Sequence, residues 1–241
     1  EKVNTILLWA LPWTLALIIP VPIIGFFVGN FIGSSSALKK SKLFSALFYI
    51  FLYMSRIPFY WFAMVLIYFF AVTLRWAPAA GAYSSKWLHP VLSFDFLLDA
   101  IYHYVLPFLT LVCSGIGGWA MGMRSAVSSQ IRATYPTYCK QLGLPFNRIR
   151  KYIERNAILP NFTVLPINFA GLVGQTLIVE VVFGYPGIGS LMYNAAYQLD
   201  YPMLEATFLI IILITLIGNL ICDILYGILN PAIGSGYLEE H

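Results

Sequence analysis

The sequence predicts an all-α protein, a polytopic membrane helix bundle with about five transmembrane helices. Of its 241 residues, 60% are hydrophobic and 10% are charged, and the mean hydropathy is +0.79. Soluble domains contain about 25% charged residues, so the 14 basic and 10 acidic side chains are too few to cover a water-exposed surface. This composition excludes an ordinary soluble enzyme, a disordered chain and a nucleic-acid-binding domain. Long apolar segments and the one-sided placement of basic residues point the same way.

A transmembrane helix requires about 20 mainly apolar residues. Five segments meet this requirement, within residues 5–33, 43–74, 100–123, 162–183 and 204–229. The second is too long for one untilted helix and contains Arg56 and Pro58, so we expect its first third to lie along the interface or to kink into the span. Prolines in and beside the other spans predict a packed bundle with bends, because neighbouring helices must satisfy the freed backbone groups.

The basic residues predict the orientation of the chain. Ten of the fourteen follow the first or the third span: Lys39, Lys40, Lys42, Arg124, Arg132, Lys140, Arg148, Arg150, Lys151 and Arg155. The positive-inside rule places these two loops in the cytoplasm, the N-terminus of the chain outside and its C-terminus inside. The chain starts at Glu1 without Met and enters an apolar segment almost at once, so we expect that a first helix is missing.

The opposite side combines an intramembrane carboxylate with a turn rich in Gly and Pro. Glu180 lies in the outer part of the fourth span, where an ionisable residue indicates function by default. Two interpretations are open for it, a structural hydrogen bond or ion pair near an outer gate and a role in the pathway. The turn that follows forms either that gate or a simple interfacial turn, and its candidate residues are Gly184, Pro186, Gly187 and Gly189. The aromatic loop at 75–99 is either an interfacial anchor or a mouth for an external partner.

The segment 124–160 predicts two short helices between two spans. Pro136 fits the first turn of the first helix, Gly143 fits a left-handed cap at its end, and Pro145 fits the start of the second. An apolar stripe at helical spacing is predicted for the second helix, formed by Phe146, Ile149 and Ile153. Such a segment either inserts into a groove of a cytosolic partner or rests on anionic headgroups.

Several motifs together resemble a known family. The longest is GQTLIVEVVFGYPGIG at residues 174–189, followed by Asp200-Tyr201-Pro202. Further matches are Arg56–Trp61, Leu106-Pro107 with Arg124-Ser125, Asp223–Tyr226 and Asn230–Ile233. Over nearly its whole length the chain resembles the membrane-spanning permease subunit of binding-protein-dependent ABC importers of the dipeptide, oligopeptide and nickel group. The resemblance implies a type I ABC importer fold, and the ending is similar to that of the first of two permeases.

The resemblance also implies a coupling loop of the type that carries Glu-Ala-Ala and a later Gly. Gly143 fits this pattern, but Thr137, Tyr138 and Cys139 occupy the Glu-Ala-Ala positions, and the spacing from Gly143 to Pro160 is one residue short. The residues expected to contact the ATPase are Thr137, Tyr138, Cys139, Gln141, Gly143, Leu144 and Pro145. Residues 1–241 then form one transmembrane permease domain, with 124–160 as the cytoplasmic coupling loop.

The implied function is import of peptides across the inner (cell) membrane, with nickel or oligosaccharide as alternatives. The implied partners are a second homologous permease, two cytosolic ATPases, an external substrate-binding protein and membrane lipid, but no nucleic acid. The chain lacks G-x-x-x-x-G-K-[ST], so ATP and Mg²⁺ are expected in the partner subunits, with no cofactor here. We expect no catalytic residue and no metal site, because the sequence shows no nucleophile–base set and no Cys/His cluster. These absences disfavour an intramembrane enzyme. A gated channel is disfavoured as well, because the sequence shows no polar stripe or repeated polar filter.

Overall fold

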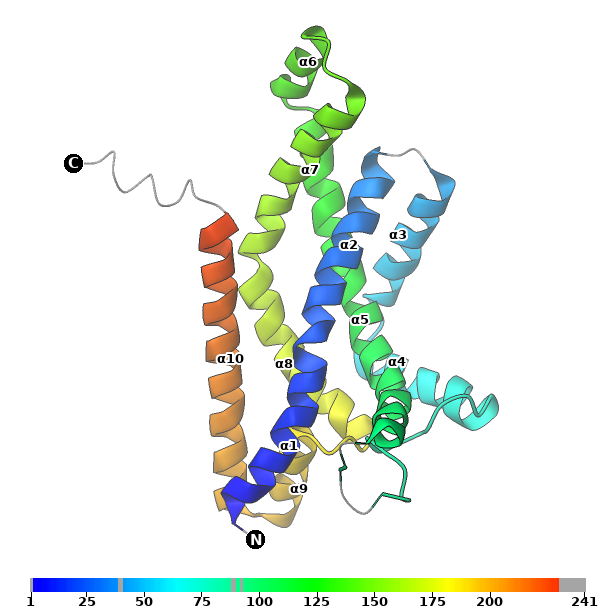
Figure 1. Ribbon diagram of the computed structural model, residues 1–241, viewed down its shortest axis with the longest axis vertical. Coiled ribbons are helices and arrows are strands. Elements are labelled where there is room, and N and C mark those ends of the chain that lie inside the picture. The colour runs from blue at the N-terminus through cyan, green and yellow to red at the C-terminus, as the bar shows by residue number, and fades with distance from the viewer. Residues whose placement is uncertain (1, 39–40, 88–89, 92, 230–241) are drawn as a thin grey trace, which may run out of the picture. The chain divides into compact units, whose positions relative to one another are not determined.

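The structure is a computed structural model that describes residues 2–38, 41–87, 90–91 and 93–229, and its regular elements there are all helical (Figure 1). The helices are α1 (Val3–Ile18), α2 (Pro20–Leu38), α3 (Lys42–Met54), α4 (Phe59–Leu66), the π-helical η1 (Ile67–Thr73), α5 (Phe94–Ile131), α6 (Thr134–Gln141), α7 (Phe146–Thr163), α8 (Leu165–Val182), α9 (Ile188–Gln198) and α10 (Tyr201–Leu229). The all-α fold class is therefore confirmed. Lys39, Lys40 and the motif Asn230–Ile233 lie outside the described residues.

Within the described part of the chain, four helical stretches are long and apolar enough to cross a membrane: Val3–Leu38, Phe94–Ile131, Leu165–Val182 and Tyr201–Ile228. The pair Lys42–Met54 and Phe59–Thr73 passes the same test together but bends by 106°, and it adds a fifth span if the two helices form one span. The structure thus has four to five candidate spans, in agreement with the predicted number of about five, and it confirms the kink in the second segment. The bend falls at Ser55–Pro58, where the proline lacks an N–H donor and disfavours helical geometry at the residue before it.

The segment 124–160 contains more helix than the two short helices predicted for it. α5 continues to Ile131, beyond the apolar stretch, and α7 continues to Thr163. Of the predicted apolar stripe, Ile149 and Ile153 are buried, whereas Phe146 is 63% exposed. Phe146 is the first residue of α7, and the buried side chains of this helix begin only at Ile149.

The chain divides into two compact units. Of the described residues, the first unit contains 2–23, 56–114 and 171–215, and the second contains 24–55, 115–170 and 216–229. A cluster of α1, α9 and α10 side chains lies in the first unit: Leu7, Ala10, Ile188, Ala195 and Met203. A cluster of α5 and α7 side chains lies in the second: Met123, Val127, Ile149, Ile153 and Ala157. The candidate gate residues from Glu180 to Gly189 lie in the first unit, and the candidate coupling residues from Thr137 to Pro145 lie in the second.

Candidate functional site

In the first unit, the carboxyl group of Glu180 ties α1 to the start of α9. Glu180 lies near the end of α8 and is 0% exposed. The hydroxyl group of Thr14 on α1 donates a hydrogen bond to Oε1 (2.7 Å), and the backbone N–H of Gly189 donates to Oε2 (2.7 Å). The N–H of Ile188 in turn donates to Thr14 Oγ1 (2.8 Å). We call Thr14, Glu180, Ile188 and Gly189 the carboxyl knot.

The knot satisfies the first N–H groups of α9, which have no partner within their own helix. Acidic groups are favoured at such a helix start. Space is also restricted here: a Cβ atom on Gly187 would overlap the Glu180 carboxyl group, and one on Gly189 would lie 2.5 Å from Leu177 Cα. Three of the predicted gate residues, Glu180, Gly187 and Gly189, therefore meet at one point because only glycine lets the backbone approach the carboxyl group.

The remaining gate candidates form the turn between α8 and α9. Gly184 is exposed and has φ +55°, a left-handed conformation that glycine adopts without strain. Pro186 is also exposed, whereas Tyr185 between them is only 1% exposed. Burial raises the pKa of the Tyr185 phenol above its ordinary value, so the ring stays neutral. Trp13 of α1 packs edge-on against it, with ring centroids 5.6 Å apart.

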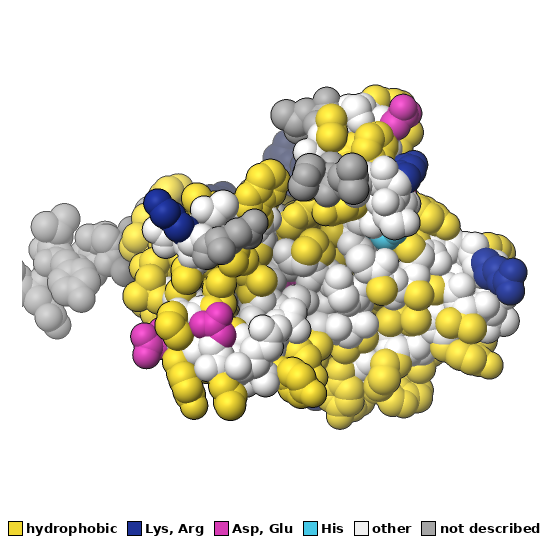
Figure 2. Space-filling model, turned by 90° about the horizontal axis from the view of Figure 1, so that it is seen from below, with side chains coloured by type: hydrophobic (Ala, Val, Ile, Leu, Met, Phe, Trp, Pro, Cys, Tyr) yellow, Lys and Arg dark blue, Asp and Glu magenta, His cyan; other side chains and the backbone are white. Residues whose placement is uncertain are grey.

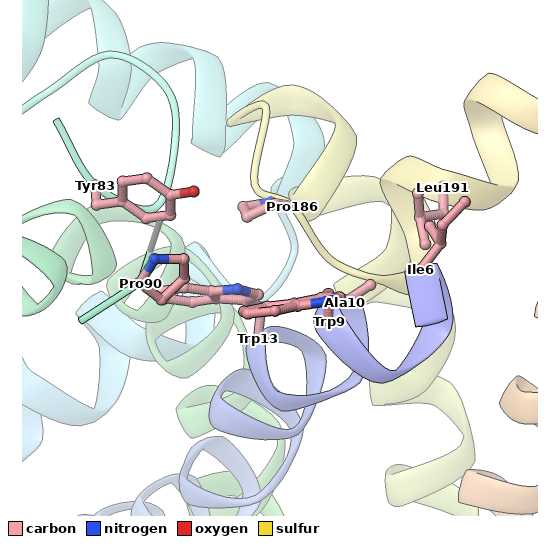
Figure 3. A pocket seen from close by; sticks show the side chains of 8 residues that line it. All are labelled: Ile6, Trp9, Ala10, Trp13, Tyr83, Pro90, Pro186 and Leu191. Carbon is pink, nitrogen blue, oxygen red and sulfur yellow. The ribbon is translucent and has the colours of Figure 1, made fainter. Parts of the chain in front are cut away.

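A pocket of about 460 Å³ lies beside this turn in the first unit (Figure 3). None of its lining residues is charged: Ile6, Trp9, Ala10, Trp13, Tyr83, Pro90, Pro186 and Leu191. Figure 3 shows the Tyr83 ring over Trp13, with its hydroxyl group directed toward Pro186. Figure 2 shows many hydrophobic side chains and few charged groups on the face seen from below. Such a pocket can accept an apolar or aromatic group.

Polar contacts beside the pocket hold Tyr83. The neighbouring Ser84 donates two hydrogen bonds to Asp99 at the start of α5, from its backbone N–H (2.7 Å) and from its hydroxyl group (2.5 Å). Lys86 adds an ion pair to the same carboxylate at 3.8 Å. Tyr83 and Pro90 belong to the aromatic loop singled out from the sequence. Sequence reasoning missed Trp9, Trp13 and Thr14, because residues within an apolar run show only that the run spans a membrane.

In the second unit, the predicted coupling residues lie on α6 and the turn that joins it to α7. Gly143 has φ +76°, and its N–H donates to the carbonyl of Lys140 (3.0 Å). The N–H of Leu144 donates to the carbonyl of Cys139 (3.1 Å), which completes a helix-ending motif that favours glycine. The predicted break at Gly143 is thus confirmed.

The side chains of this segment point in two directions. Cys139 and Leu144 pack against the α5–α7 cluster. The others selected from the sequence are exposed, namely Thr137, Tyr138, Gln141, Gly143 and Pro145. The basic residues Arg148, Lys151 and Arg155 on α7 are exposed too. The segment from α6 to the start of α7 therefore exposes polar and aromatic side chains, while Cys139 and Leu144 attach it to the α5–α7 cluster.

Comparison with known proteins identifies the family. Residues 29–235 match the family described as "Binding-protein-dependent transport system inner membrane component". The chain belongs to this family. It is a transport permease and a multi-pass membrane protein.

Three similar proteins are named as permeases for peptides or for glutathione. This permease is 30% identical to the oligopeptide transport system permease protein AppB of Bacillus subtilis, a match covering 95% of this chain and 69% of AppB. It is 28% identical to the di/tripeptide permease DppB of Pseudomonas aeruginosa, covering 92% of this chain and 70% of DppB. The match to the glutathione permease GsiC of Escherichia coli K12 is 32% identical, over 70% of this chain and 51% of GsiC.

Solved structures share the fold of the permease. The MetNI methionine ABC transporter, in inward-facing conformations, gives a TM-score of 0.68 at 17% identity, covering 93% of this chain and 96% of that one. An amino acid ABC transporter gives 0.60 at 17% identity, covering 95% and 94%. The predicted ABC transporter permease fold is thus confirmed.

Proposed function

We propose that this permease forms half of the translocation pathway for peptides across the cell membrane. The observation that carries the substrate class is that the relatives named above are permeases for oligopeptides, for di- and tripeptides and for glutathione, which are all peptides. A second homologous permease completes the pathway, an external binding protein delivers the peptide, and membrane lipid surrounds the spans. Two cytosolic ATPases bind ATP and Mg²⁺, and this chain holds no cofactor.

The coupling loop of this function is residues 124–160, with α6 and the Gly143 turn as the part that meets an ATPase. Its support is the exposure of Tyr138 and Gln141 beside the cap at Gly143. An ATPase that closes on ATP moves this segment and so shifts the bundle between two states, because nucleotide binds one state more tightly. The outer gate is the turn from Gly184 to Gly189, held by the carboxyl knot.

Reconstitution tests the substrate class. Proteoliposomes would contain this chain with its second permease, its ATPases and its binding protein. ATP-dependent uptake of a labelled alanine tripeptide is the expected result. Uptake of Ni²⁺ or of a labelled oligosaccharide in place of the peptide would overturn the proposed substrate class.

The orientation of the chain yields a prediction with two matched tyrosines. Tyr138 on α6 is 62% exposed and Tyr197 on α9 is 83% exposed. In a chain without its native cysteines, a membrane-impermeant maleimide added outside intact cells should label Tyr197→Cys and leave Tyr138→Cys unlabelled, because the basic α6–α7 segment is cytoplasmic. Opening the cells should expose both sites, and the reverse pattern would contradict the orientation.

A second prediction concerns the left-handed turn at Gly143. A Cβ atom there has no described atom within 4 Å, so substitution acts through backbone strain, which is about 1–2 kcal/mol for a side chain at positive φ. Gly143→Val should lower the population of the capped turn, and with it ATP-driven uptake, about tenfold. Gly143→Asn should retain most of the uptake, since asparagine tolerates this conformation. Equal uptake by the Val and Asn variants would contradict this role of the turn.

A further inference from the structure

Polar side chains join α2 to α7 inside the second unit. The amide of Asn161 on α7 donates hydrogen bonds to Asn30 Oδ1 on α2 (2.6 Å) and to the carbonyl of Trp119 on α5 (3.3 Å). The Asn30 amide donates to the carbonyl of Phe26 one turn away (2.7 Å). Asn30 is 6% exposed and Asn161 is 4% exposed. Water therefore cannot replace these bonds easily.

A second connection lies nearer the start of α7. One carboxylate oxygen of Glu154 accepts a hydrogen bond from the hydroxyl group of Ser34 on α2 (2.5 Å). The same oxygen accepts bonds from Arg150 Nε (3.0 Å) and Nη2 (2.9 Å), one turn before it on α7. Arg150 thus orients the carboxylate toward α2. We call Asn30, Ser34, Glu154 and Asn161 the polar clamp.

Small residues bring the backbones of these helices close together. A Cβ atom on Gly33 would overlap the carbonyl of Ala120, and one on Gly29 would lie 2.9 Å from the carbonyl of Ile116. A Cβ atom on Gly122 would overlap the side-chain oxygen of Asn161. At such short separations α2, α5 and α7 pack closely in this register, because small residues let their backbones approach one another.

We propose that the polar clamp transmits the movement of α6 to α2 and α5, with Glu154 and Asn161 as its positioning residues. The proposal rests on the coupling role of α6 proposed above. Apolar contacts between α5 and α7 are non-directional and do not by themselves select this register. Hydrogen bonds between buried groups are directional, and a slip would leave their donors unsatisfied. The clamp therefore makes α2 follow α7.

Two labels in the assembled transporter test this transmission. One is attached at Tyr138→Cys on α6, and the other at Phe27→Cys on α2, where the side chain is 67% exposed. The native cysteines are replaced by alanine, and each label is followed by its fluorescence when ATP is added to the complex in nanodiscs. With the clamp intact, both labels should respond.

The clamp variants should separate the two responses. Ser34→Ala, Glu154→Ala and Asn161→Leu should reduce the response at position 27 at least about fivefold, the lower end of typical coupling between sites, and leave that at position 138 unchanged. Glu154→Gln should restore most of the response at position 27, because its side-chain oxygen still accepts from Ser34. Matched controls are Ser36→Ala, whose hydroxyl group bonds the carbonyl of Gly33 in its own helix, and Asn168→Leu, an exposed amide on α8.

Each other outcome overturns the proposal. Unchanged responses at both positions in the clamp variants would show that α2 follows α6 by another route. Parallel loss at both positions in the mild Ser34→Ala variant would assign the clamp a purely structural role. Absence of any response at position 138 with the clamp intact would overturn the coupling role of α6, and this proposal with it, while peptide uptake would be measured separately.

Discussion

Replacing Glu180 with alanine is expected to lower the free energy of unfolding by about 2–6 kcal/mol, since each of two buried donors left without an acceptor costs about 1–3 kcal/mol. The two donors with the shortest bonds to Glu180 are the Thr14 hydroxyl group and the Gly189 N–H, both at 2.7 Å. The start of α9 would then lose its tie to α1. Thermal unfolding of the purified permease complex in detergent measures the effect, and peptide uptake should fall with it.

Two further substitutions sharpen this prediction. Glu180→Gln should cost about half as much, because one side-chain oxygen remains to accept from Gly189 while the new NH₂ group cannot accept from Thr14. Glu205→Ala on α10 removes an exposed carboxylate and should change stability by less than about 0.5 kcal/mol. A Glu180→Ala protein as stable as the Glu205→Ala protein would contradict the structural importance of the knot.

Gly189→Val is expected to be comparably damaging, at about 3–5 kcal/mol, a range reached by severe overpacking. Its Cβ atom would lie 2.5 Å from Leu177 Cα, 2.6 Å from the Leu177 carbonyl oxygen and 2.9 Å from Glu180 Oε2. The first two atoms belong to the backbone of α8, which cannot rotate away as a side chain can. The amount of folded protein extracted from membranes and its unfolding temperature measure this effect.

Gly174 on α8 offers the matched control. No described atom lies within 4 Å of a Cβ atom placed there, and alanine is favoured over glycine inside a helix by about 0.5–1 kcal/mol. Gly174→Ala should therefore keep or slightly raise the unfolding temperature. If the Gly189→Val protein had the same unfolding temperature as the Gly174→Ala protein, the close contact between α8 and α9 at Gly189 would be contradicted.

The spans and the helix ends could be predicted because their causes are local in the chain. Apolar runs long enough to cross a membrane are visible in any window of about 20 residues. The kink before Phe59 follows from Pro58, and the cap after α6 follows from Gly143, because each residue restricts or permits particular backbone angles. The exposure of Phe146 could not be predicted, because helical spacing identifies a face of α7 but not where along the helix that face begins to pack.

The sites could be predicted only in part. Glu180 and the glycines after it stood out, as a carboxylate in an apolar run and as a dense turn. Thr14 did not, since one hydroxyl group in an apolar helix gives no signal of its partner 166 residues away. Asn30 and Asn161, separated by 131 residues, escaped notice for the same reason.

The sequence by itself determined that this protein is helical, spans a membrane several times and resembles importer permeases, because hydropathy, backbone restriction and motif spacing are properties of neighbouring residues. Only the tertiary structure decided which polar groups meet: Thr14 with Glu180 in one unit, and Ser34 with Glu154 in the other. A hydrogen bond requires two atoms to lie within about 3 Å. That distance is set by helix packing between segments far apart in the chain.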